Sequence, residues 1–177
     1  MPSLEIESLY QGLVGGIDEA GRGPWAGPVV AATAVFLDPL SLSPALLNDI
    51  QDSKKLSKVK REQLYQELLT LRSFIYGIGI ASVEEIDRLN ILKATFLAME
   101  RSMQPLSQKP QTLLIDGKHI PSFQSIQTIP VIKGDDISLS IAAASILAKV
   151  SRDKIMETLA LIHPFYGWEH NAGYGTE

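Results

Sequence analysis

The sequence contains no cysteine, and this absence excludes several classes of protein. Disulfide-stapled scaffolds, thiolate zinc sites and cysteine nucleophiles all require that residue. A chain without disulfides fits a reducing compartment, so we expect a cytoplasmic protein. Residues 1–14 contain acidic side chains but no lysine or arginine, which is unlike the start of a secretory signal peptide.

Long apolar runs are also missing. Each apolar stretch is interrupted by Gly, Ser, Asp or Lys before it reaches the roughly 18 residues of a membrane-spanning helix, so we expect no membrane partner. Aromatic residues make up only 7% of the chain, beside 45% hydrophobic and 20% charged residues. This ordinary globular balance excludes a disordered, collagen-like or coiled-coil protein. At 177 residues, the chain is expected to form one domain with a sizeable core.

Basic residues are in the minority, because the formal net charge is −4. Taken alone, this argues mildly against a nucleic-acid partner, whose readers usually have a basic surface. The distribution matters more than the sum, however, since five of the sixteen basic residues lie within residues 54–61. This cluster is either the solvated start of a helix or a patch for phosphates. Its members are Lys54, Lys55, Lys58, Lys60 and Arg61.

Hydrophobic patterning predicts five strands. Three early strands with modest connections favour an antiparallel meander, and later strands separated by helices favour parallel additions. Pro130 places the last strand at an edge or a bulge. We therefore expect an α/β fold, in which a mixed sheet has helices on both sides. The expected strands are residues 12–19, 28–37, 73–81, 111–116 and 126–132.

Helical spacing and capping signals predict the intervening helices. Val59, Leu64, Leu68 and Leu71 share one helical face after Ser57. Ser82 and Glu85 form a capping-box pattern, and residues 92–103 carry an apolar stripe. Residues 137–161 are expected to be a long buried helix, and residues 163–177 an aromatic loop. A short helix is expected within residues 38–53.

Acidic residues collect where the predicted strands end. Asp18 and Glu19 close the first strand, Asp116 closes the fourth, and Asp135 and Asp136 follow the fifth. Ligand sites in α/β sheets form at such strand ends. Clustered carboxylates repel one another unless a cation lies among them, and oxygen ligands favour Mg²⁺ or Mn²⁺ over zinc. Neighbouring strand residues point to opposite faces, so Asp18 and Glu19 share a site only where the strand ends or bends.

The glycine-rich segment after the first strand offers a second indication. Gly21, Arg22 and Gly23 let the backbone approach a sugar or phosphate closely, although a tight turn is the alternative interpretation. The spacing superficially matches a dinucleotide-binding fingerprint. That interpretation is rejected because Pro24 and Pro28 occupy the expected phosphate-binding helix. Walker, nucleophile-elbow and HExxH motifs are absent, and the three histidines show no ligand spacing.

Seven segments together resemble the ribonuclease HII family, and the match extends over nearly the whole chain. The first, GIDEAGRGPWAGPVVAA, is long and specific. The segments follow one another in the family's order. They are residues 16–32, DSKKLS at 52–57, NILKAT at 90–95, LLIDG at 113–117, KGD at 133–135, AAASILAKVSRD at 142–153 and YGWEHNAGYGT at 166–176.

The resemblance implies a ribonuclease H-like, mixed five-stranded sheet and a set of site residues. By motif position, the four metal-binding catalytic carboxylates are Asp18, Glu19, Asp116 and Asp135. Asp135 is preferred to its neighbour Asp136 because it holds the third place of KGD, and Asp153 is a second decoy. Gly21, Arg22 and Gly23 match the motif that senses the ribonucleotide. Tyr174, rather than Tyr166, matches the tyrosine that packs on the ribose.

The resemblance further implies a metal-dependent endonuclease. Its substrates are RNA/DNA hybrids and duplex DNA with a single embedded ribonucleotide, cut on the 5′ side to leave 3′-hydroxyl and 5′-phosphate ends. Two Mg²⁺ or Mn²⁺ ions are expected to activate a water and stabilise the leaving oxygen. Lys54, Lys55 and Lys149 are expected to hold phosphates. The implied role is ribonucleotide removal in DNA replication and repair, and a monomer is expected.

Three alternatives stay open at this point. Ribonuclease HIII has an extra N-terminal domain, whereas 17 residues precede Asp18 here. Other nucleases and integrases of the fold share the carboxylates but would lack both GRG and GYGT. The third alternative is a catalytically impaired, hybrid-binding fragment. Family members continue past GYGT into a C-terminal helical segment, whereas this chain ends at Glu177. Residues 1–177 are thus expected to form one catalytic domain without that segment.

Overall fold

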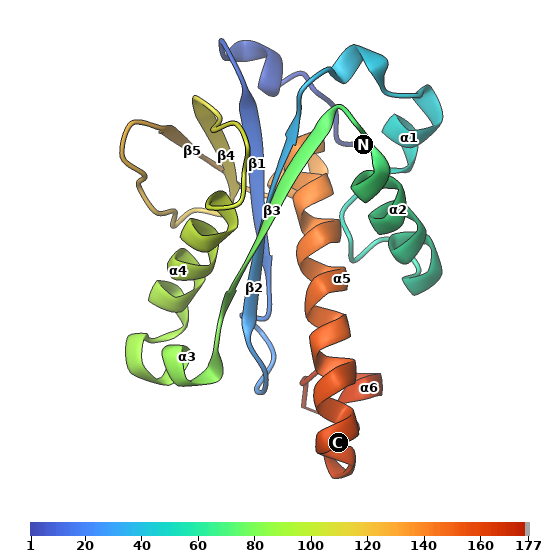
Figure 1. Cartoon of the computed structure of the whole chain (residues 1–177), viewed down its shortest axis with the longest axis vertical. Coiled ribbons are helices and arrows are strands. Elements are labelled where there is room, and N and C mark those ends of the chain that lie inside the picture. The colour runs from blue at the N-terminus through green and yellow to red at the C-terminus, as the bar shows by residue number, and fades with distance from the viewer. Residues whose placement is uncertain (176–177) are drawn as a thin grey trace.

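A five-stranded mixed sheet forms the centre of the molecule, with the strand order β3-β2-β1-β4-β5 (Figure 1). The computed structural model describes residues 1–175, apart from the side chain of Leu40. Thr176, the last residue of the GYGT motif, and Glu177 lie outside the described residues. The strands are β1 (Val14–Ala20), β2 (Val29–Phe36), β3 (Phe74–Ala81), β4 (Thr112–Asp116) and β5 (Gln127–Val131).

The strand pairing confirms the predicted mixture of directions. β1, β2 and β3 form the antiparallel meander, and β4 and β5 add in parallel on the other side of β1. β5 is an edge strand, as Pro130 indicated, so the missing N–H of proline costs no ladder bond in the interior of the sheet. All eight residues of β2 are buried, which explains its continuous apolar sequence.

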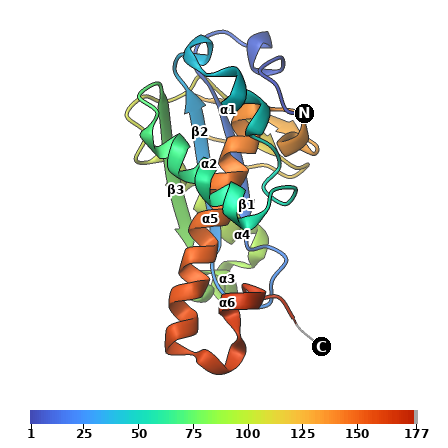
Figure 2. The ribbon, with the colours of Figure 1, turned by 90° about the vertical axis from the view of Figure 1, so that its right-hand side faces the viewer.

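Helices cover both faces of the sheet. Figure 1 shows α3 and α4 on one side of the strands and α2 and α5 on the other. Figure 2 shows α2 lying across α5, and the two helices are in contact. The helices are α1 (Pro44–Asp49), α2 (Lys58–Thr70), α3 (Val83–Leu89), α4 (Ile91–Met103), α5 (Leu139–Ile162) and α6 (Trp168–Asn171).

The longest helix, α5, packs directly on the central strand. A Cβ built on Gly16 would lie 2.2 Å from the carbonyl carbon of Ser140, so only glycine permits this contact. The buried part of α5 is rich in alanine, which lets the helix approach the sheet closely. This packing fixes α5 against β1, and hence against the carboxylates near the end of β1.

Local signals account for most element boundaries. Ser82 and Glu85 form the predicted capping box, with both reciprocal bonds present. Ser57 and Ser138 accept backbone hydrogen bonds at the starts of α2 and α5. One predicted helical face was wrong at Val59, which is 65% exposed because it lies in the first turn of α2, away from the sheet.

The C-terminal segment was predicted as a loop, but it contains two helical turns. These are a 3₁₀ turn at Pro164–Tyr166 and the four-residue α6, followed by a return of the chain towards the β1–β2 loop (Figure 2). Helices this short carry too few positions for a periodic pattern. Among residues 1–175, no helix is both long and apolar enough to cross a bilayer.

Candidate active site

Three of the four predicted carboxylates line one cavity of about 260 Å³. Asp18 and Glu19 lie near the end of β1, and Asp116 is the last residue of β4. The ladder between β1 and β4 stops at Ile17 and Ile115, whereas β1 continues to Ala20 paired with β2 only. The strand was expected to end at Asp18 and Glu19, but β1 continues through them in register with β2 to Ala20. Asp18 and Glu19 nevertheless both line the cavity.

Asp18 is the most buried of the three carboxylates that line this cavity. It is only 4% exposed, and its Oδ1 accepts a hydrogen bond from the Glu19 amide at 2.7 Å. Burial raises the pKa of Asp18 well above its usual value, and the charges of Glu19 and Asp116 raise it further. The Ser145 hydroxyl of α5 acts in the opposite direction on the same pKa. In the absence of a cation, the fold therefore disfavours a negative charge on this side chain.

Only one of the two carboxylate oxygens of Glu19 has a hydrogen-bond partner among the described residues. Its Oε1 accepts a hydrogen bond from Arg22 Nη1 at 2.9 Å, whereas its Oε2 is buried and has no hydrogen-bond partner among the described residues. Burial raises the pKa of Glu19, and Arg22 only partly offsets this effect. A buried carboxylate oxygen without a partner is costly, so it is available to a ligand that carries positive charge.

The fourth predicted carboxylate, Asp135, lies on a 3₁₀ turn, Gly134–Asp136, rather than at a strand end. The Gly134 amide donates to Asp116 Oδ1 at 2.7 Å, which holds the turn against β4. Burial raises the pKa of Asp135, as do the charges of Asp52 and Asp116. Asp135 does not line the cavity of Asp18 itself, but Lys54, which does, lies 3.6 Å from its Oδ2.

The two decoy acids lie in different surroundings. Asp136 is bonded to Lys55, which lowers the pKa of its carboxyl. Asp153 is held on α5 by Lys149, at 2.7 Å, and by Arg61, at 3.8 Å. Asp135, by contrast, is 7% exposed and lies beside the other acids. Asp135 therefore differs from Asp136 and Asp153 in its surroundings, although the sequence alone shows three aspartates.

The predicted basic patch divides into two parts. Lys54 and Lys149 line the carboxylate cavity, whereas Lys55 does not. Burial acts to lower the pKa of Lys54, but the charges of Asp18, Asp52 and Asp135 outweigh it and raise that pKa. The remaining members are paired with acids or with backbone. Lys58 binds Glu157, Lys60 binds Asp49, and Arg61 donates to the carbonyls of Ser53 and Leu56.

The glycine-rich loop and the C-terminal tyrosine meet at the rim of the cavity. Gly21, Arg22, Gly23 and Tyr174 all line it. Gly21 has a φ of +108°, and a Cβ there would lie 2.4 Å from the Pro28 carbonyl oxygen. A Cβ on Gly23 would lie 3.7 Å from the Tyr174 ring. The other candidate, Tyr166, instead stacks on Trp168 with ring centroids 4.9 Å apart.

Arg152 is the residue that sequence reasoning missed. It is 1% exposed, and its guanidinium donates to the carbonyls of Pro28 at 2.9 Å, Ala26 at 2.8 Å and Ala172 at 2.8 Å. These bonds tie the glycine-rich loop and the C-terminal segment to α5. A signal was present, because Arg152 lies four residues from both Ala148 and Met156 and so falls on the buried stripe of the helix.

The donor set fits a hard divalent cation. It consists of oxygen atoms, one of which is the unpartnered Glu19 Oε2. The pKa values of Asp18, Glu19 and Asp135 are all raised, chiefly by burial. A cation would offset that cost. Within residues 1–175, no three histidine, aspartate or glutamate side chains already converge as a formed metal cage.

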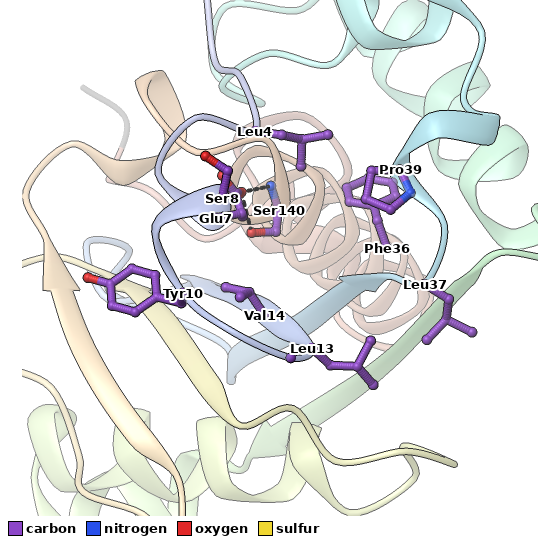
Figure 3. Close-up of a pocket in the computed structure, with 11 residues that line it drawn as sticks. Leu4, Glu7, Ser8, Tyr10, Leu13, Val14, Phe36, Leu37, Pro39 and Ser140 are labelled. Atoms are coloured by element: carbon purple, nitrogen blue, oxygen red, sulfur yellow. Dashed lines mark hydrogen bonds between the residues drawn. The ribbon is translucent and has the colours of Figure 1, made fainter.

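A second cavity, of about 380 Å³, lies at the other end of β1 (Figure 3). Apolar side chains line most of it, including Leu13, Val14 and Phe36. Its buried acid, Glu7, accepts hydrogen bonds from the Ser138 hydroxyl and from the amide and hydroxyl of Ser140. Glu7 thus fastens the N-terminal segment to the start of α5, and this cavity shares no residue with the carboxylate site.

Comparison with known proteins identifies the family. The ribonuclease HII family model matches residues 15–177. Ribonuclease HII of Jannaschia sp. (strain CCS1) is 54% identical over 99% of this chain and 84% of its own length. The protein of that name from Paramagnetospirillum magneticum is 55% identical over 99% of this chain and 86% of its own length.

A solved structure gives the same answer for the fold. The crystal structure of ribonuclease H2 from Pyrococcus horikoshii OT3 superposes with a TM-score of 0.76 at 27% identity. The match covers 94% of this chain and 82% of that one. The mixed sheet flanked by helices is therefore a ribonuclease H fold. The chain belongs to the ribonuclease HII family and is an enzyme of the ribonuclease H type.

Proposed function

We propose that this chain is a metal-dependent endonuclease that cuts the RNA strand of RNA/DNA hybrids and cuts duplex DNA 5′ of a single embedded ribonucleotide. The products would be 3′-hydroxyl and 5′-phosphate ends. The observation that carries the proposal is the cavity that joins Asp18, Glu19 and Asp116 to the glycine-rich loop and Tyr174. Carboxylates for a cation and a surface for a sugar thus adjoin each other in one place.

Asp18, Glu19, Asp116 and Asp135 would hold the metal ions. Mg²⁺ or Mn²⁺ would supply an activated water and charge stabilisation at the leaving oxygen. The protein's own contribution is to hold the four carboxylates in place. The Gly134 amide fixes one oxygen of Asp116, and Arg22 fixes one oxygen of Glu19. A carboxylate fixed by a second partner keeps its remaining oxygen aimed at the ligand.

The substrate would be recognised by its 2′-hydroxyl, the group that distinguishes RNA from DNA at one residue. The backbone of Gly21 and Gly23 can approach that hydroxyl because neither residue has a Cβ. Tyr174 would pack under the ribose. Lys54 and Lys149, which line the cavity, and Lys55, which lies outside it, would bind phosphates.

We further propose that residues 1–177 act as one catalytic domain, as a monomer in the cytoplasm. The absence of cysteine supports the compartment. The corresponding role is the removal of ribonucleotides from DNA during replication and repair. An activity that accepts a single embedded ribonucleotide is what such removal requires.

The test uses a labelled DNA duplex with one ribonucleotide, incubated with Mg²⁺, Mn²⁺ or EDTA. We expect a metal-dependent cut on the 5′ side of the ribonucleotide, lost in Asp18→Asn. An all-DNA duplex is the control for specificity, and Asp87→Asn, at an exposed position of α3, is the control for loss of an acid outside the carboxylate set. Intact substrate with both metals would refute the catalytic proposal. Retained binding in that case would identify a hybrid-binding protein without nuclease activity.

A further inference from the structure

Trp25 is the most exposed aromatic residue of the glycine-rich loop and takes no part in the functions described above. Its side chain is 89% exposed, and it lies two residues after Gly23. A large indole in water is unfavourable, because it holds apolar surface that the fold does not bury. Exposed aromatics of this kind beside a binding cavity are typical contact residues for nucleic acid.

The backbone of Trp25 is anchored, which limits the positions available to its indole. The Trp25 and Ala26 amides both donate to the Gly173 carbonyl, at 2.9 and 3.2 Å. Arg152 in turn binds the Ala26 carbonyl at 2.8 Å. A loop held from both sides loses little conformational freedom when a ligand binds, so contacts at its tip contribute more to affinity.

The indole lies beside the segment that carries Tyr174. A Cβ on Gly175 would lie 3.0 Å from the Cη2 and Cζ3 atoms of Trp25, so the ring lies against the backbone of Gly175. Tyr174, its neighbour, is 52% exposed at the rim of the cavity. The indole therefore lies against the segment that carries Tyr174, and Trp25 itself does not line the cavity.

We propose that Trp25 is an additional substrate-contacting residue, whose indole packs against the sugar of a nucleotide adjoining the ribonucleotide in a bound duplex. The inference rests on the proposed function. If Gly21 and Gly23 approach the 2′-hydroxyl, the bound strand extends past the loop, and Trp25 is the next large side chain in the loop. The partner is the apolar face of a deoxyribose, which a duplex presents at every step whatever its sequence.

The chain contains only two tryptophans, which makes a direct test feasible. Trp168→Phe leaves Trp25 as the single tryptophan, which is excited selectively over the tyrosines, and the phenyl ring preserves stacking on Tyr166. Acrylamide quenching is measured in EDTA, with and without a saturating duplex that contains one ribonucleotide. We expect the duplex to lower the quenching constant at least about twofold, because burial removes the indole from water. Unchanged quenching while anisotropy of the labelled duplex reports full binding would overturn the inference.

Kinetics supply an independent readout. Trp25→Ala should raise KM for the ribonucleotide-containing duplex about tenfold, the scale of losing one aromatic contact, and leave kcat nearly unchanged. Trp25→Phe should stay within about threefold of the parent, because a phenyl ring keeps most of the contact area. Phe165→Ala is the matched control, because Phe165 is 98% exposed but lies beyond the end of α5 and does not line the carboxylate cavity.

The outcomes separate this inference from the proposed function. If the parent cleaves and Trp25→Ala matches it in KM, Trp25 has no role and the nuclease proposal stands. If the parent does not cleave with either metal, the nuclease proposal fails. The quenching result then still decides whether Trp25 contacts the duplex.

Discussion

The backbone amide of Gly134 donates a hydrogen bond to Oδ1 of Asp116, at 2.7 Å. This bond joins the end of β4 to the turn that carries Asp135, and it connects parts of the site that are 18 residues apart in the chain. One carboxylate oxygen of Asp116 is thereby fixed in direction. The other oxygen remains free to face the cavity that Asp116 shares with Asp18 and Glu19.

Two substitutions of Asp116 separate its charge from this bond. Asp116→Asn keeps an acceptor for the Gly134 amide, so the turn should stay in place while the charge is lost. We expect cleavage to fall by at least about 100-fold, as for disruption at a metal-binding site, with thermal stability unchanged or higher. Asp116→Ala should lose cleavage and also about 1–3 kcal/mol of stability, because the amide loses its partner. Single-turnover cleavage is measured with Mg²⁺. Thermal stability is measured by melting in EDTA.

Asp18→Asn should stabilise the metal-free protein. The pKa of Asp18 is raised by burial and then by Glu19 and Asp116, so its ionised form opposes folding at neutral pH. For a carboxyl with a raised pKa, this penalty is absent at low pH and grows as the pH rises through the folded-state value. We expect the Tm of Asp18→Asn in EDTA at pH 7 to exceed that of the parent by about 2–4 °C or more, corresponding to about 1 kcal/mol.

At about pH 4, the two proteins should melt at closer temperatures, since Asp18 of the parent is then largely protonated. Mg²⁺ or Mn²⁺ should raise the Tm of the parent more than that of the variant. A variant that is less stable than the parent at pH 7 in EDTA would show that the buried charge is compensated by the fold itself.

Arg152 should control the order of the glycine-rich loop and of the C-terminal segment. Arg152→Met leaves three backbone carbonyls without their donor and should cost about 3 kcal/mol or more. Arg152→Lys keeps the charge, but one ammonium cannot satisfy three carbonyls that a planar guanidinium reaches. In both variants, we expect faster amide hydrogen exchange in residues 21–28 and 172–175, and a higher KM. Arg88→Lys on the exposed face of α3 is the matched control. Unchanged exchange in those two segments would contradict the role.

The ion pair of Glu85 and Arg101 should make stability depend on acidic pH. The Arg101 hydrogen bond, followed by the bond from the Ser82 amide, lowers the pKa of Glu85 to about 2. A depressed carboxyl pKa gives stability that is complete above the unfolded value and is lost as the pH falls through the folded value. The difference in Tm between the parent and Glu85→Gln should thus be largest above about pH 4.5 and vanish near pH 2.

Direct titration of Glu85 by NMR checks the same prediction without a variant. A Glu85 midpoint near 4.5 would show that Arg101 does not hold the carboxylate in solution.

The pattern of apolar residues predicted the strands of the sheet well, and the reason is physical. Most strands bury at least one face, so their apolar residues are constrained locally, although in β5 only Val131 is buried. The meander followed from neighbouring strands in the chain pairing with each other, even though α1 and α2 lie between β2 and β3. The first turn of α2 was different. Val59 belongs to the apolar repeat by spacing, yet it is exposed, since only the later turns of that helix meet α5 and the sheet. A repeat tells which residues share a face but not how far the partner surface extends.

The candidate site was predictable where it depends on motifs and strand ends, as at Asp18, Glu19 and Asp116. Arg152 was not found, because burial of an arginine is improbable from composition and its partners are backbone atoms of distant segments. The ion-pair partner of each lysine also could not be predicted from its charge alone. Lys54 and Lys55 are adjacent and alike, but only Lys54 faces the cavity, whereas Lys55 binds Asp136.

The parallel pairing of β1 with β4 has a consequence for the protein during its synthesis. Leu13 and Gln111, bonded at the start of this pair, are 98 residues apart, and Glu7 meets Ser140 at a separation of 133 residues. Domains complete their folding only after the required chain has emerged, and non-local pairing is slow. During synthesis, Asp18 can therefore meet Asp116 only after β4 has been made, and β1 can pack against α5 only after that helix has been made. A nascent chain would lack the assembled carboxylate site until α5 has been synthesised.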